Sequence, residues 1–383
     1  MIDEKENVVE LSRLIGLAAE GVTLEQVVFA HISDLHFGAP GSRRTKELLK
    51  LGRASHKLEL SGDLPNAFRD AADDAELDDE ENLHILISGD LTSGGAGLEL
   101  DHVNHYIHER WEVGPDDPGL VGLGIKPDRL LSIAGNHDHW DDHTWPNVPA
   151  FTETIYGLHF KETPWMQTWS SPQGKLRLEL FGVDSASGLE GDGYNRRARG
   201  AISHKEARLL EQSLTLSDQA LIHPGTVRVR AIVCHHSLAF NFGEHSRPFK
   251  YYATLGANSL DDYSIERLLE IANRHSVCTI LTGHIHRFLK PFEHLRPARL
   301  LSLTSKKWVW ELTCTTTLQD PASDNEPNGF WVHRVRLVDG HPEWVPIQYV
   351  WIPAESRFQR HLEYNPLRPL EFSVQGTSVA AGS

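Results

Sequence analysis

The chain has 383 residues, a length that fits one large α/β domain or two to three smaller ones. Of these residues 40% are hydrophobic and 23% are charged, as is typical of a soluble globular protein. Its three cysteines (Cys234, Cys278 and Cys314) are too few and too far apart for a disulfide framework or a CxxC zinc site. The net charge of -16 argues against a general basic surface for nucleic acid or anionic membranes.

The first residues carry no export signal, because Met1 to Asn7 lacks a basic stretch followed by an apolar one. No apolar run approaches the roughly 20 residues that cross a bilayer. We therefore expect a cytoplasmic protein without a membrane segment. Residues 1–23 have the apolar spacing of a short N-terminal helical segment.

Continuous apolar runs predict strands buried on both faces, as in a sheet covered by helices. Such a run lies at 27–33, and further strands are expected at 83–88, 129–134, 227–233 and 277–282, with alternating residues at 176–183. Helices are expected at 203–216 and 262–275. Ser203 and Glu206 have the spacing of a capping box at the start of the first.

Beyond residue 295 the pattern changes to short aromatic, β-rich segments separated by turn-forming residues. These segments, at 307–317, 329–338 and 344–351, predict an antiparallel meander that extends or covers the core. We divide the chain into the segment 1–23, a main domain at 24–295, a β-rich extension at 296–355 and a tail of low order at 356–383.

Five of the predicted strands end in a polar cluster. The clusters are Asp34-Leu35-His36, Gly89-Asp90, Gly135-Asn136-His137-Asp138, Cys234-His235-His236 and Gly283-His284-Ile285-His286. Ligands of open α/β sheets bind beyond the carboxyl ends of the strands, so the clusters are expected to converge on one site.

The donor types in these clusters indicate a metal site. Carboxylate, amide and imidazole donors without a thiolate suit divalent Mn, Fe, Zn, Co or Ni. The Asp-x-His and His-x-His spacings place two side chains on the same side of an extended segment. Seven candidate ligands are too many for one ion and fit two. Two ions about 3.5–4 Å apart are the apparatus of in-line displacement at phosphorus.

With these motifs in this order, the sequence resembles the calcineurin-like metallophosphoesterases. The resemblance covers about residues 27–290. A second Gly-Asp pair, Gly62-Asp63, does not follow an apolar strand, so we exclude it and expect Asp63 to be a solvated loop residue. The family's fold implies a four-layer α/β/β/α sandwich of two mixed sheets flanked by helices, with the C-terminal β-rich extension added.

The resemblance also implies a role for each motif residue. Asp34, His36 and His286 would hold the first metal ion, and Asn136, His235 and His284 the second. Asp90 would bridge the two ions together with a water that they activate. His137 would not be a ligand; it would stand near the leaving oxygen as the catalytic acid. Asp138 would fix the local geometry.

The implied reaction is hydrolysis of a phosphoester. Residues 32–38 are most similar to bacterial cyclic-nucleotide phosphodiesterase-like members, and Ser93 replaces the iron-binding tyrosine of purple acid phosphatases. We therefore expect a small phosphodiester substrate, such as a cyclic nucleotide, rather than a nucleic-acid polymer. A phosphomonoesterase, a nuclease and a non-catalytic interaction scaffold remain alternatives. The metals' identity and a homodimer through the aromatic meander stay open.

Other residues near the clusters have ordinary interpretations. His236 would line the substrate pocket or support its neighbour, because adjacent strand residues face opposite ways. The acidic run 73–81 is expected to be solvated, and Cys234 to be a small buried residue. The remaining histidines and tryptophans considered, expected to be structural or in loops, are His31, His84, His105, His139, His143, Trp140 and Trp145.

Overall fold

The structure is a computed structural model. It describes residues 24–39, 46, 57–77, 82–109, 122–139, 162–186, 200–238, 260–284, 298–302, 308–318 and 328–363. The helical segment expected at 1–23 lies outside these residues, as do His143, Trp140, Trp145 and His286.

The first sheet has six strands in the order β12-β11-β10-β1-β2-β3. Its parallel half consists of β1 (Gln26–Ile32), β2 (His84–Ile87) and β3 (Leu130–Ser132). Its antiparallel half consists of β10 (Gly329–Val338), β11 (His341–Ile352) and β12 (Arg357–Glu363). The halves join where β10 pairs antiparallel with β1.

The second sheet has the order β4-β5-β6-β7-β9-β8. Four neighbouring strands are parallel: β5 (Leu176–Gly182), β6 (Val227–Val233), β7 (Thr279–Thr282) and β9 (Trp308–Thr313). The antiparallel strands β4 (Trp165–Ser170) and β8 (Ala298–Ser302) form the two edges. Both sheets are therefore mixed.

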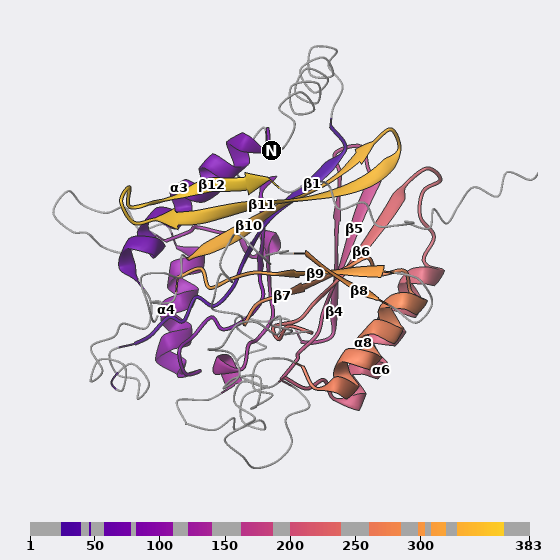
Figure 1. The fold of residues 1–383 in the computed structure, drawn as a ribbon, viewed down its shortest axis with the longest axis horizontal. Helices are drawn as coiled ribbons and strands as arrows, with labels where there is room; N and C mark the ends of the chain where they lie inside the picture. The colour runs from indigo at the N-terminus through magenta and orange to yellow at the C-terminus, as the bar shows by residue number, and fades with distance from the viewer. Residues whose placement is uncertain are drawn as a thin grey trace, which may run out of the picture.

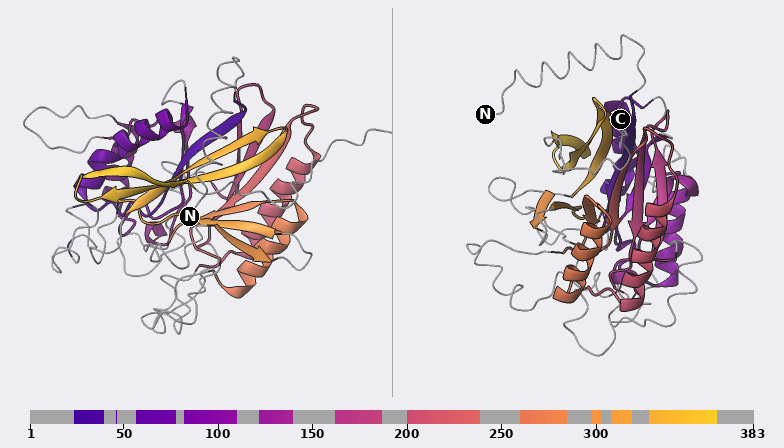
Figure 2. Two further views of the ribbon diagram at one scale, coloured as in Figure 1. Left: turned by 45° about the horizontal axis from the view of Figure 1, so that its top comes forward. Right: turned by 90° about the vertical axis from the view of Figure 1, so that its right-hand side faces the viewer.

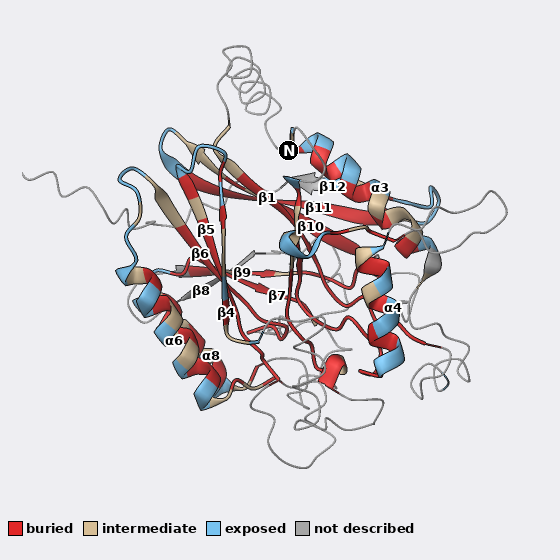
Figure 3. Cartoon of the chain, turned by 180° about the vertical axis from the view of Figure 1, so that it is seen from behind, coloured by how far each residue is buried: buried red, intermediate tan, exposed pale blue. Residues whose placement is uncertain are grey.

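Helices cover the outer face of each sheet (Figures 1 and 2). The first sheet carries α3 (Leu58–Asp74) and α4 (Gly97–His108), and the second carries α6 (His204–Gln219) and α8 (Asp262–Arg274). Short 3-10 turns, η2 (Pro127–Arg129) and η3 (His137–His139), flank β3. The faces of the helices toward the sheets are buried and the opposite faces are exposed (Figure 3).

Alternation along the strands separates three apolar layers. In β1, Val28 and Ala30 pack toward α3 and α4, while Val27 and Phe29 pack toward the second sheet. Phe181 and Ile232 face α6 and α8. This is the predicted four-layer α/β/β/α sandwich, and the fold prediction is confirmed.

The C-terminal strands form part of both sheets. β8 and β9 complete the second sheet, and β10 to β12 complete the first. β12 occupies part of the segment predicted as a tail of low order, because Phe358 is buried against Phe330 and Trp351. The domain boundary at 295 stays a prediction.

Two local features refine the expectations. The α6 helix is capped as predicted, because Ser203 Oγ accepts from the Glu206 amide at 3.1 Å. The Glu206 carboxylate does not complete a capping box there; it accepts from the Asp184 amide at 3.0 Å. Among the described helices, none has the length and apolar character to cross a membrane.

Candidate metal centre

The predicted polar clusters meet at one end of the two sheets. Each follows a strand of a parallel set, β1, β2 and β3 in one sheet and β6 and β7 in the other, so their carboxyl ends point to the same edge. The site residues brought together are Asp34, His36, Asp90, Asn136, His137, His235 and His284. The eighth candidate, His286, is outside the described residues.

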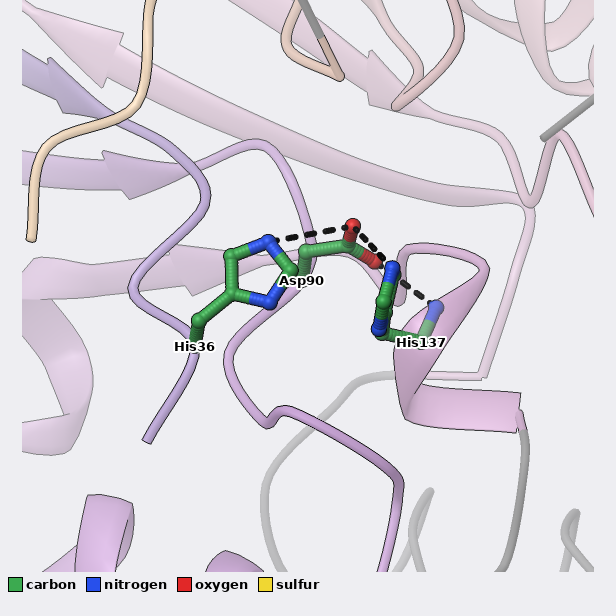
Figure 4. A group of neighbouring side chains, drawn as sticks. All are labelled: His36, Asp90 and His137. Carbon is green, nitrogen blue, oxygen red and sulfur yellow. Dashed lines mark hydrogen bonds and ion pairs between the residues drawn. The ribbon is translucent and has the colours of Figure 1, made fainter. Parts of the chain in front are cut away.

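Asp90 lies at the centre of the site. Its Oδ1 accepts from the His137 amide at 2.8 Å. Its fully buried Oδ2 receives no hydrogen bond among the described residues. Three imidazole Nε2 atoms surround that oxygen, from His235 at 3.3 Å, His36 at 3.6 Å and His137 at 4.0 Å (Figure 4 shows the last two). A buried carboxylate oxygen left in this state fits a bound cation.

His235 has one nitrogen committed to the backbone and one directed into the site. Its Nδ1 lies 2.7 Å from the Ser88 carbonyl oxygen, so Nδ1 carries a proton, and in the neutral form of the ring that binds a metal ion Nε2 carries the lone pair. This Nε2 faces Asn136 Oδ1 at 3.2 Å, His284 Nδ1 at 3.2 Å and Asp90 Oδ2 at 3.3 Å. Carboxylate, amide and imidazole donors thus converge on one position, and donors of these types are typical of metal sites.

The spacing of these atoms fits a shared ion. Donors bound tetrahedrally at about 2.0–2.1 Å from zinc lie about 3.3–3.4 Å from one another. The separations from His235 Nε2 are 3.2–3.3 Å. Asp90, His235 and His284 form one of the two groups of described side chains whose geometry could hold a metal ion. The sequence-predicted set for the second metal is thus brought together.

The other group consists of His36, Asp90 and His137. His36 Nε2 also lies 3.7 Å from Asp34 Oδ1. His137 donates through Nδ1 to the Ser93 carbonyl at 2.8 Å, and this leaves its Nε2 facing the site. His137 therefore lies within reach of the position assigned to the first metal ion. The sequence interpretation placed it near the leaving oxygen and not among the metal ligands.

The electrostatics of the site favour a positive occupant. Burial would raise the pKa of Asp90, but the imidazoles of His235, His137 and His36 outweigh it and hold that pKa well below its usual range. Burial would lower the pKa of His235, but the Asp90 and Asp34 carboxylates raise it to about 9. The carboxylates attract positive charge to the position that the converging donors surround.

The backbone is strained where it presents these side chains. Asp34, His36, Asp90 and His284 all have positive φ, between 50° and 68°. This conformation is uncommon for residues other than glycine, and such outliers cluster at functional sites. Hydrogen bonds between the turns hold this conformation. The Asp34 amide donates to the Gly89 carbonyl and the His36 amide to the Asp90 carbonyl, and the His284 amide donates to Asp34 Oδ2 at 3.1 Å.

Asp138 ties two of these turns together, as its predicted geometric role requires. One carboxylate oxygen accepts from the amides of Leu91 (3.2 Å) and Gly135 (2.9 Å). The other accepts from the Thr92 amide and hydroxyl, both at 2.9 Å. Asp138 is buried and joins the turn after β2, which carries Asp90, to the turn after β3.

Asp138→Asn is expected to destabilise the protein by about 1–3 kcal/mol, because the amide NH2 meets the Leu91 and Gly135 amides, which are themselves donors. Urea unfolding measures the change. Asp70→Asn, at an exposed position of α3, is the control and is expected to be neutral. Equal stability of the two variants would contradict this role of Asp138.

Two residues of the surroundings were missed from the sequence. Asp184 and Ser185 follow β5, the one predicted strand whose polar end we did not include. Asp184 Oδ2 lies 3.3 Å from Nε2 of buried His139, and Ser185 Oγ lies 2.7 Å from His236 Nδ1. The signal that could have found them is the one used for the other clusters, polar residues directly after a buried strand.

A buried chain of hydrogen bonds reaches the site through the interior. Trp344 Nε1 donates to His333 Nδ1 at 3.1 Å, His333 Nε2 lies 3.4 Å from His31 Nδ1, and His31 Nε2 lies 2.9 Å from Ser88 Oγ. Burial lowers the pKa of His31 to about 3, so the ring is neutral. His31 is therefore structural, as expected, and it supports the residue whose carbonyl holds His235.

The remaining described candidates lie outside the ligand groups. Asp63 is a helical residue of α3 rather than a loop residue, and its carboxylate accepts from the Phe358 amide at 2.7 Å. His84 stacks on Trp169, and exposed His105 pairs with Glu109. Burial raises the pKa of the Cys234 thiol, which removes it as a nucleophile.

Three solved structures are similar to this chain at low sequence identity. GAP50, the anchor in the inner membrane complex of Plasmodium, is 11% identical with a TM-score of 0.44, covering 89% of each chain. A 5'-nucleotidase precursor from Thermus thermophilus is 12% identical with a TM-score of 0.41, covering 87% of this chain and 55% of that one. Vps29 of Chaetomium thermophilum is 11% identical with a TM-score of 0.31, covering 91% and 99%.

A comparison with curated proteins gives no significant match. The family model for calcineurin-like phosphoesterases, in contrast, matches residues 27–288, more than half of the chain. The match spans every described strand end that contributes to the site. The chain therefore belongs to the calcineurin-like phosphoesterase family.

Proposed function

We propose that this protein is a dinuclear metal-dependent phosphodiesterase for small substrates. The observation that carries the proposal is the convergence of Asp90, Asn136, His235 and His284 around one position, with the His235 proton committed elsewhere. The second ion would be held there, and the first by Asp34, His36 and His286, with Asp90 shared. Divalent Mn, Fe, Zn, Co and Ni all suit this donor set.

Two bound divalent ions supply Lewis-acid charge and lower the pKa of coordinated water. The chain's own residues supply orientation. The carbonyl of Ser88 fixes the His235 ring, and the amide of His137 fixes the Asp90 carboxylate. His137 is 14% exposed while Asp90 is fully buried, so His137 stands at the open side of the site, where a substrate approaches.

His137 is the proposed proton donor to the leaving oxygen. Its Nδ1 proton is held by the Ser93 carbonyl, so the transferable proton is the one on Nε2. As the P–O bond breaks, the leaving alkoxide takes that proton and the imidazole becomes neutral. His137 thereby acts on the leaving group.

His137→Ala is expected to retain both metals and to lower turnover by about 10²–10⁴-fold for diesters with poor leaving groups. The loss should be much smaller for bis-p-nitrophenyl phosphate, because p-nitrophenolate needs no proton to leave. Metal analysis accompanies the kinetics. Loss of a metal ion from the variant would instead make His137 a ligand, in keeping with its grouping with His36 and Asp90.

The small substrate is supported by charge. A net charge of -16 opposes binding of a polyanion, and the family resemblance of residues 32–38 points to cyclic nucleotides or similar diesters. The test is a hydrolysis panel of cyclic nucleotides, glycerophosphodiesters, phosphomonoesters and single-stranded DNA with added manganese. Faster turnover of monoesters, or salt-sensitive cleavage of DNA, would replace the proposal by a phosphomonoesterase or a nuclease. If no substrate of the panel is hydrolysed, the result would support a non-catalytic interaction scaffold.

A further inference from the structure

His236 lies in the wall of the site beside the second ligand group. Its side chain is fully buried. Its ring centre is 4.6 Å from that of His284 and 5.1 Å from that of His235. The His236 ring therefore packs beside the His284 and His235 imidazoles.

The hydrogen bonds of Ser185 determine which nitrogen carries the proton. Ser185 Oγ accepts from the His236 amide at 3.1 Å and lies 2.7 Å from His236 Nδ1. Among the described residues the hydroxyl proton has Nδ1 as its only acceptor, so Ser185 donates to Nδ1. The neutral ring then carries its proton on Nε2.

This Nε2–H is a buried donor without a partner. The atom is inaccessible to solvent and makes no hydrogen bond within the described part of the chain. Gly200 closes the opposite edge of the ring, where an added Cβ would stand 2.4 Å from Cγ and 2.6 Å from Nδ1. The unsatisfied edge is therefore the one turned away from Gly200.

His236 and His235 differ in what their Nε2 atoms offer to a ligand. His235 Nε2 offers a lone pair, which a metal requires, whereas His236 Nε2 offers a proton, which a metal repels. A non-bridging phosphoryl oxygen is an acceptor with negative charge, and an N–H group in a water-poor site binds it strongly.

We propose that His236 Nε2–H donates a hydrogen bond to a non-bridging oxygen of the substrate phosphoryl group, with Ser185 as the positioning residue that holds the required tautomer. The inference rests on the proposed phosphoesterase function and names the recognition element of the same site. It assigns His236 to substrate binding rather than to metal binding.

The main test is His236→Phe, which keeps a planar ring beside His284 and removes the donor. Manganese-loaded proteins are compared by metal analysis and by calorimetric titration with inorganic phosphate. The expected result is two retained metals and phosphate affinity lower by about 10-fold or more. The kcat/KM for hydrolysis of bis-p-nitrophenyl phosphate should fall by a similar factor. Unchanged phosphate affinity, or loss of a metal ion, would overturn the proposal.

His84→Phe is the matched control, because it makes the same replacement at a half-buried histidine that stacks on Trp169. It should leave phosphate affinity unchanged. Ser185→Ala and Ser185→Thr give a second route should His236→Phe not fold. Loss of phosphate affinity in the alanine variant, with recovery in the threonine variant, supports the tautomer argument; equal affinities contradict it.

The phosphodiesterase activity and the role of His236 are tested by separate measurements. If the unmodified protein binds two metal ions and phosphate but hydrolyses no diester, the proposed activity fails, while the phosphate titrations still decide the role of His236. If the unmodified protein hydrolyses diesters and the His236→Phe variant binds phosphate as tightly, only the role of His236 fails.

Discussion

Replacing Asp90 by asparagine is expected to lower phosphodiester hydrolysis by about 10³-fold or more, at or beyond the upper end for loss of one electrostatic contact, and to reduce the bound metal content. The isosteric amide can still accept from the His137 amide through Oδ1, so the local hydrogen bond survives. What disappears is the negative charge of Oδ2, which faces the Nε2 atoms of both ligand groups. Kinetics and metal analysis of the same preparation measure the two losses.

The chain provides its own control for this change. Asp63 also follows a glycine, but it lies in α3 and its carboxylate contacts the backbone of β12. Asp63→Asn should retain the metals and full activity. Full activity of Asp90→Asn with both metals bound would remove Asp90 from the bridging role.

Gly89→Ala is expected to destabilise the protein by about 2–5 kcal/mol and to displace His235 from the site. Gly89 has φ +105°, and an added Cβ would stand 2.4 Å from His235 Nδ1 and 2.9 Å from the Gly135 Cα. That nitrogen is the atom held by the Ser88 carbonyl, so the methyl group competes with the bond that orients the ring. Urea unfolding and metal content measure the result.

Gly225→Ala separates backbone strain from this contact. Gly225 also has positive φ, +87°, but an added Cβ would meet nothing within 4 Å. We expect a cost of about 1–2 kcal/mol from the left-handed conformation, with metals and activity retained. If Gly89→Ala behaved like Gly225→Ala, the close packing of Gly89 against His235 would be without consequence.

The parts of the fold that were predicted well are those with a local signature. β6 has the predicted bounds, 227–233, and β1 begins and ends one residue earlier than predicted. Both are largely buried, and five of the seven residues in each are apolar. The edge strand β4 escaped notice because Met166 is exposed and Gln167 half-buried between Trp165 and Trp169.

The pairing of distant segments carries no such signature. β10 lies beside β1, with Gln26 opposite Arg336, although about 300 positions separate them in the chain. No local pattern distinguishes that pairing from an added meander. For the same reason the tail prediction missed β12, whose burial depends on Phe330 and Trp351.

In the candidate site, too, some features have a local sequence signature and others depend on contacts between distant segments. Its clusters could be predicted because each follows a strand. The extended conformation assumed for the Asp34-x-His36 spacing was wrong, because both residues have positive φ and lie in a turn after β1. The supporting contacts could not. The place of Asp184 and Ser185 after β5 was a usable signal for a site, but it does not show which histidines they contact, and a histidine within β10 is unremarkable in sequence. Only the packed structure shows that Ser185 holds His236, or that His333 and His31 connect Trp344 to Ser88.

The central claim, that two ions share the Asp90 carboxylate, is tested most directly by anomalous diffraction from crystals of the manganese-loaded protein. We expect two anomalous peaks about 3.5–4 Å apart on either side of Asp90, one beside His36 and one between Asn136, His235 and His284. A single peak, or peaks away from Asp90 in a protein that hydrolyses diesters, would contradict it.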